Sequence, residues 1–131
     1  MEMTLLEIVQ ETIELHKGFD FLRVKALKES IMNNGFVKPL FIFDKDGYTH
    51  LANGSHRKEA LKGLLEDSMS GDVTILSSSY DEEELENLPI PVFELEFDSI
   101  QANEFAALID DDERIEYLKQ ILTEEELELY K

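Results

Sequence analysis

The chain has 131 residues and a mass of 15.1 kDa, which is the size of one compact domain. Its 30 acidic residues outnumber its 12 basic ones, and the formal net charge of -18 argues against a surface that follows the phosphate backbone of DNA. The chain contains no cysteine, which excludes disulfide bonds, thiolate metal sites and a thiol nucleophile.

The negative charge is concentrated in the second half of the chain. Residues 66–131 hold 21 of the 30 acidic residues and only three of the 12 basic ones. No apolar run is long enough to cross a membrane, and the acidic, amphipathic N-terminus differs from a secretory signal. These features predict a cytoplasmic protein that does not engage a membrane.

The beginning of the chain is predicted to form two helices. Thr4-x-x-Glu7 has the form of a capping box, and apolar residues recur at helical spacing as far as His16, which predicts a first helix ending at Lys17-Gly18. A second apolar stripe predicts a helix over residues 21–33, which the pair Asn34-Gly35 closes.

A β-hairpin and a third helix are predicted next. Residues 39–43 (PLFIF) and 48–52 (YTHLA) are rich in strand-forming residues, and the turn-forming residues 44–47 (DKDG) separate them. Asn53-Gly54 breaks the second strand, and residues 55–67 carry apolar residues in helical register. A strand is therefore expected to run into a helix through a turn that contains glycine.

The following segment alternates between polar and apolar character. Residues 73–76 (VTIL) predict a short strand, and residues 77–88 are polar and acidic enough to predict a mobile excursion with one helical turn. In residues 90–97 (IPVFELEF), Phe93, Leu95 and Phe97 alternate with glutamates. This alternation predicts a strand with one buried and one solvent-exposed face.

The C-terminal third is predicted to be helical and acidic. Ser99 is the predicted cap of one helix, the acidic residues 110–113 suit the start of another, and Thr123-x-x-Glu126 is the capping box of a third. The whole pattern predicts an α+β fold. A small mixed sheet of about four strands with packed helices is expected over residues 1–98, followed by an acidic helical appendage over residues 99–131 that packs on the same domain.

Residues 53–58 (NGSHRK) carry most of the chemistry. A glycine at a strand-to-helix turn lets a ligand approach the backbone, and the amide groups of the first helical turn attract phosphate. Ser55, His56, Arg57 and Lys58 add hydrogen-bond donors beside them. The simpler interpretation is that these residues form only a turn and a helix cap, with Arg57 and Lys58 in solvent.

The order of elements around this segment resembles the ParB/sulfiredoxin-like superfamily. The resemblance covers residues 21–97 and is carried by Gly35-x-x-x-Pro39-Leu40 and by Gly54-Ser55-His56-Arg57. Members act as sulfiredoxins, as nucleotide-dependent partition-protein switches, as free-serine kinases or as nucleases. The resemblance implies that Gly54, Ser55, His56 and Arg57 bind nucleotide phosphates, with Lys38 as a further candidate.

The sequence departs from two branches of that superfamily. Sulfiredoxin carries a cysteine where this chain has Ser55, so the resemblance does not extend to sulfiredoxin activity, which needs a thiolate. Partition proteins carry a helix-turn-helix reader of DNA after this fold, whereas the remaining residues here are few and strongly acidic. Direct binding of duplex DNA is therefore not expected.

Two classes of function remain. The leading hypothesis is a domain that binds a phosphate-bearing ligand, such as the nucleotide ATP or CTP, with Mg²⁺ as a candidate cofactor. If the site is catalytic, phosphoryl transfer or phosphodiester hydrolysis would fit it, as in a nucleotide hydrolase, a kinase-like phosphotransferase or a nuclease. The alternative is a non-catalytic acidic protein that binds a basic partner protein as an inhibitor or as a mimic of nucleic acid.

Other polar residues are interpreted as structural. His16 and His50 have no neighbours at the spacing of metal ligands or of a catalytic triad. The carboxylates of residues 110–113 point in different directions on a helix start and lack the spacing of a calcium-binding loop. The sequence identifies neither a catalytic base nor a metal ligand.

Overall fold

The computed structural model describes residues 1–15 and 18–131 and confirms an α+β fold. A five-stranded mixed sheet runs in the order β1-β7-β3-β4-β2, and β5 pairs with β6 in a separate two-stranded ribbon. The strands of the main sheet are β1 (Glu2–Thr4), β2 (Thr12–Glu14), β3 (Leu40–Lys45), β4 (Tyr48–Leu51) and β7 (Pro89–Glu94). The ribbon consists of β5 (Val73–Ile75) and β6 (Ser78–Tyr80).

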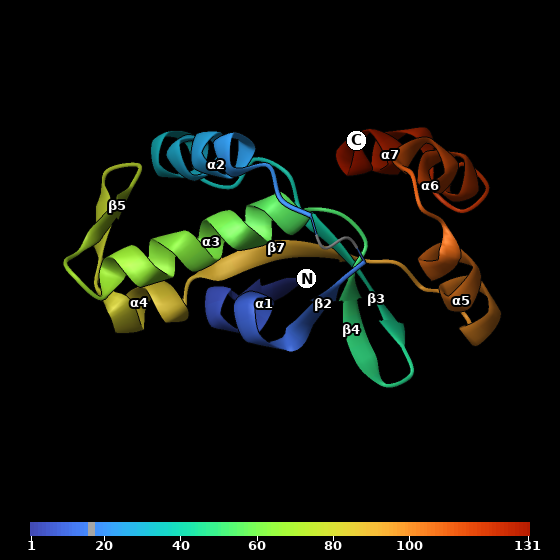
Figure 1. Cartoon of the computed structure of the whole chain (residues 1–131), viewed down its shortest axis with the longest axis horizontal. Coiled ribbons are helices and arrows are strands. Elements are labelled where there is room, and N and C mark those ends of the chain that lie inside the picture. Colours follow the sequence, from blue (N-terminus) through green and yellow to red (C-terminus); the bar gives the residue numbers. More distant parts are fainter. Residues whose placement is uncertain (16–17) are drawn as a thin grey trace.

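Seven helices of the described chain fall into two groups (Figure 1). The first group is α1 (Leu5–Glu11), α2 (Phe21–Asn34), α3 (Ser55–Ser68) and α4 (Glu82–Glu86). The second group is α5 (Ser99–Ala107), α6 (Asp111–Leu118) and α7 (Glu124–Tyr130), which gather at the other end of the molecule. The predicted hairpin is confirmed as the antiparallel pair of β3 and β4, while β7 lies parallel to β3.

The main sheet carries hydrophobic side chains on both faces. Along β3, Leu40 and Ile42 pack into a core with α1 to α4, whereas Phe41 and Phe43 pack into a second core with α5 to α7. This alternation is the two-residue period of a strand whose two faces are both covered. The central strand therefore joins the acidic C-terminal helices to the rest of the fold.

The strand β7 differs from its prediction in two ways: it ends at Glu94, so that Leu95 and Phe97 follow it, and both of its faces are largely covered. Phe93, Leu95 and Phe97 do pack in the second core, with the ring of Phe93 stacked at 4.7 Å on that of Phe41. The opposite face is not wet over most of the strand, because Ile90 and Val92 are buried in the first core.

The predicted first helix is too long. The helix α1 starts at the expected capping box of Thr4 but ends at Glu11, and Thr12–Glu14 form β2, parallel to β4. A buried lysine of α3 holds this strand, since the Nζ atom of Lys58 donates to the carbonyl of Thr12 at 2.7 Å and pairs with Glu14 at 3.2 Å. This contact joins residues that are 46 positions apart, so no pattern of neighbouring residues in the sequence predicts it.

The helical turn predicted within residues 77–88 is confirmed as α4, whereas β6 and the anchoring of the segment were not predicted. A capping box between Asp81 and Glu84 starts the helix. Leu85 is fully buried in the first core, which anchors the segment. In the C-terminal third, Asp98 rather than Ser99 caps α5, whereas Thr123 caps α7 as predicted.

Candidate functional site

The turn between β4 and α3 is shaped by Gly54. Its backbone has φ of +86°, a left-handed conformation that glycine adopts without strain. A Cβ atom at this position would collide with the side chain of Leu40 and would lie 3.1 Å from Nη2 of Arg57. The absence of a side chain therefore leaves room for the Arg57 guanidinium directly against the turn.

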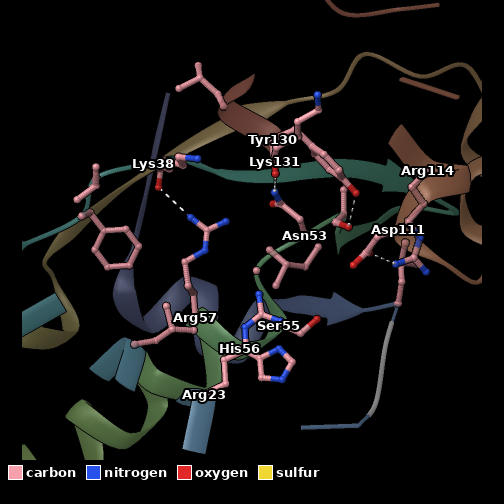
Figure 2. A pocket seen from close by; sticks show the side chains of 18 of the residues that line it. Arg23, Lys38, Asn53, Ser55, His56, Arg57, Asp111, Arg114, Tyr130 and Lys131 are labelled. Atoms are coloured by element: carbon pink, nitrogen blue, oxygen red, sulfur yellow. Dashed lines mark hydrogen bonds and ion pairs between the residues drawn. The ribbon is translucent and has the colours of Figure 1, made fainter. Parts of the chain in front are cut away.

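The neighbouring Asn53 connects this turn to the end of the chain. Its Oδ1 atom accepts from the backbone N–H of Phe41 at 2.9 Å, and its Nδ2 atom donates to the carbonyl of Tyr130 at 2.9 Å. The Tyr130 hydroxyl donates in turn to the carbonyl of Ala52 at 3.4 Å. These bonds hold α7 beside the start of α3, so both elements border the same space (Figure 2).

That space is a pocket of about 690 Å³, open to solvent. One wall is formed by α2, the loop before β3 and the start of α3, and the other by α6, α7 and the loop before α6. A volume of this size is typical of sites for small molecules and cofactors. Of the described residues that line it, five are lysine or arginine and two are aspartate: Arg23, Lys38, Arg57, Arg114, Lys131, Asp110 and Asp111. The pocket is thus locally cationic in a chain with net charge -18.

Arg57 is the best positioned cation of the first wall. Its Nη1 atom donates to the carbonyl of Lys38 at 3.0 Å, with a longer contact of 3.4 Å to that of Pro39. Burial, together with the nearby charge of Arg23, lowers the pKa of Arg57 to about 10. The two guanidinium groups repel each other, and an anion bound between them would relieve that repulsion.

The other predicted residues divide into those that line the pocket and one that does not. Ser55 and His56 line it, and Nε2 of His56 accepts from the backbone N–H of Asp20 at 3.0 Å. The His56 ring also meets the edge of Phe19 at 5.8 Å. Lys58 does not line the pocket, because its ammonium group is bonded to Thr12 and Glu14 of β2.

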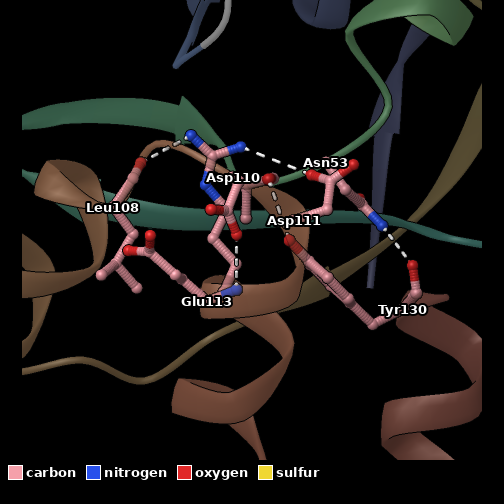
Figure 3. A network of polar contacts seen from close by, with 8 residues as sticks. Asn53, Leu108, Asp110, Asp111, Glu113 and Tyr130 are labelled. Carbon is pink, nitrogen blue, oxygen red and sulfur yellow. Dashed lines mark hydrogen bonds and ion pairs between the residues drawn. The ribbon is translucent and has the colours of Figure 1, made fainter.

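Sequence reasoning missed the second wall. Arg114 is the basic residue of an otherwise acidic α6, and its side chain is only 8% exposed. Its Nη2 atom donates to the carbonyl of Leu108 at 2.9 Å, while Nη1 lies 3.7 Å from Oδ1 of Asp111 (Figure 3). Its buried Nε atom has no hydrogen-bond partner among the described residues. An arginine at this spacing in an acidic helix is also typical of a surface ion pair, so the sequence alone could not identify it.

The remaining candidates have structural explanations. His50 stacks on Phe43 at 5.5 Å, and its Nδ1 atom lies 3.1 Å from the carbonyl of Tyr48. The carboxylate of Asp110 accepts from the backbone N–H of Glu113 at 2.9 Å and so caps α6. His16 lies outside the described residues. Within residues 1–15 and 18–131, no group of three or more potential metal ligands comes together.

The described helices include none that is long and apolar enough to span a membrane. No protein-family model matches the sequence, and no curated protein is significantly similar to it. The interpretation of the pocket therefore depends on its own geometry and charge.

Proposed function

We propose that the pocket binds a phosphate-bearing ligand, specifically a nucleotide, against the start of α3. Gly54 leaves room for the Arg57 guanidinium against the turn, and the first turn of α3 presents backbone amides and the Ser55 hydroxyl. Arg57, Arg23 and Lys38 supply the positive charge that neutralises phosphate oxygens. The expected resemblance to the ParB/sulfiredoxin-like superfamily implies the same role for Gly54, Ser55, Arg57 and Lys38, but not for Arg23.

The observation that carries the proposal is the pair of adjacent guanidinium groups. Arg23 is close enough to Arg57 to lower its pKa, yet no ion pair found among the described residues neutralises either of them or Lys38. Clustered cations that share a pocket and lack carboxylate partners are expected where an anionic ligand supplies the missing charge.

The acidic surface has a simpler explanation than a basic partner protein. Many of its carboxylates lie in the first turns of α4, α6 and α7, where they interact favourably with the helix dipoles. Capping residues at Asp81, Asp110 and Thr123 complete these helix starts. Their placement is accounted for by helix stability, and we do not propose partner binding as the function.

Calorimetric titration with ATP, CTP and GTP, each with and without Mg²⁺, tests the proposal. Arg23→Gln is expected to weaken binding about 10- to 100-fold, because a charge-assisted hydrogen bond is worth roughly 1.5–3 kcal/mol. Lys25→Gln removes the same charge from an exposed position of α2 that does not line the pocket, and it should leave the affinity nearly unchanged.

The absence of binding by all three nucleotides would overturn the proposal, as would equal effects of the two variants. Release of inorganic phosphate from each nucleotide, measured over time with Mg²⁺, separates a binding domain from a hydrolase. Arg57→Ala is the less informative variant, because Arg57 also holds the backbone at Lys38 and Pro39.

A further inference from the structure

The Arg114 guanidinium is incompletely satisfied. It is 8% exposed, yet its one contact to a carboxylate, that of Asp111, is a long 3.7 Å, and its Nε atom has no partner among the described residues. Burying a charged group with an unmade hydrogen bond is costly. The Nε atom is enclosed by protein, so a ligand in the pocket would be bound through Nη1, whose only polar contact among the described residues is the long one to Asp111.

Asp111 beside it has spare acceptor capacity. The Asp111 side chain is 86% exposed and lines the same pocket. The pair therefore presents hydrogen-bond donors and acceptors side by side. In Figure 2, Asp111 and Arg114 lie on the opposite side of the pocket from Lys38 and Arg57.

Apolar side chains line the pocket together with this polar pair. Ile109, Ile115 and Leu129 line the same wall, and Ile109 is 85% exposed although it lies at the edge of a pocket. A flat aromatic group bound there would remove this apolar surface from water. The wall thus combines apolar contacts with a donor and an acceptor, which are the features needed to hold a nucleobase.

We infer that this wall, formed by Arg114, Asp111 and the apolar residues of α6 and α7, is a subsite for the base of the nucleotide. The inference rests on the proposed function, in which phosphates occupy the α3 wall. Asp111 accepts from an exocyclic amino group of the base, and Arg114 donates to a neighbouring carbonyl or ring nitrogen. Cytosine, guanine and adenine carry such an amino group, whereas uracil and hypoxanthine do not.

A second anionic group fits this wall less well. Asp110 and Asp111 offset the charges of Arg114 and Lys131 in the lining, so this wall offers a phosphate no net positive charge. An anion would also gain nothing from the acceptor atoms of Asp111. The chemistry of the wall therefore favours a neutral group with both donors and acceptors.

Matched ligands test this inference. CTP is compared with UTP, and GTP with inosine triphosphate, so that each pair differs chiefly in the amino group. Tripolyphosphate, which has no base, measures the phosphate site alone. We expect CTP and GTP to bind about tenfold more tightly than their amino-free partners, as a charge-assisted hydrogen bond predicts.

Matched variants test the assigned residues. Asp111→Ala should abolish the preference for amino-bearing bases without weakening tripolyphosphate binding. Asp112→Ala removes the next carboxylate of the same helix, which is exposed and does not line the pocket, and it should preserve the preference. Arg114→Lys should weaken nucleotides more than tripolyphosphate, with the melting temperature as a check on folding.

Two results would overturn the base subsite while leaving the phosphate site intact. One is tripolyphosphate binding that depends on Arg23 with no discrimination among bases. The other is stronger nucleotide binding by Asp111→Ala than by Asp112→Ala, which would show that the wall receives an anionic group instead. If neither tripolyphosphate nor any nucleotide binds, both proposals fail together.

Discussion

Replacing Gly54 by alanine should damage both the fold and the pocket. Two separate losses of folding stability add at this position. The left-handed backbone, with φ of +86°, costs a residue with a side chain about 1–2 kcal/mol. The new Cβ atom would also overlap the side chain of Leu40, which is fully buried in the first core, and such overpacking typically costs about 1–3 kcal/mol.

The sum of these costs is about 3 kcal/mol. For a chain of this size, each kcal/mol lowers the melting temperature by about 3 °C, so the expected decrease is roughly 10 °C. The Cβ atom would also lie 3.1 and 3.2 Å from two nitrogens of Arg57 and would push the guanidinium from its place beside Lys38. Ligand affinity should therefore decrease even at temperatures where the variant is fully folded.

Two other glycine positions separate the cost of the left-handed backbone from the cost of the overlap with Leu40. Gly47 has φ of +81° but open space around it, so Gly47→Ala should show the backbone cost alone, about 1 kcal/mol. Gly71 has open space and no left-handed backbone, and Gly71→Ala should be close to neutral. Thermal unfolding followed by circular dichroism measures all three variants. A Gly54→Ala variant that is as stable as Gly47→Ala would refute the reasoning from the contact with Leu40.

Three further changes test how the C-terminal helices are attached. Asn53→Ala removes the bonds to Phe41 and Tyr130, and urea unfolding should show a loss of about 2–3 kcal/mol. Truncation after Asp98 exposes Phe41 and Phe43, and it should produce strong binding of a hydrophobic dye instead of an intact core. Burial raises the pKa of Tyr130 to about 12, so the unfolded chain ionises first, near pH 10. The free energy of unfolding should therefore decrease by about 3 kcal/mol between pH 10 and 12. The decrease should be smaller in Tyr130→Phe. If the unchanged protein and Tyr130→Phe lose the same stability over this pH range, the assignment to Tyr130 is wrong.

Much of the candidate site was predictable because its information is local. The Asn53-Gly54 turn, the helix after it and the hairpin before it are encoded by neighbouring residues, and the structure contains all three. A glycine followed by serine and arginine at a helix start indicates an anion site through the same short-range chemistry. Such features depend on φ, on capping and on two-residue or helical periodicity, all of which act within a few residues.

The errors arose where distant residues decide the outcome. The segment Thr12–Glu14 continues a helical pattern in the sequence. It nevertheless forms a strand, because it pairs with β4 and accepts a hydrogen bond from the buried Lys58. The acidic α4 is ordered because Leu85 is buried in the first core, which is formed mainly by other elements. Local propensity is weak compared with burial and long-range pairing, so the tertiary contacts prevail in both places.

The amino-acid sequence by itself determined the α+β class, the acidic second half and the glycine turn that starts α3, since each depends on composition or on neighbouring residues. Only the tertiary structure decided that the second half returns to the turn and that Arg114 and Asp111 face Arg57 across one pocket. The physical reason is that the Phe41 face of β3 must be buried, and α5 to α7 are the elements that bury it.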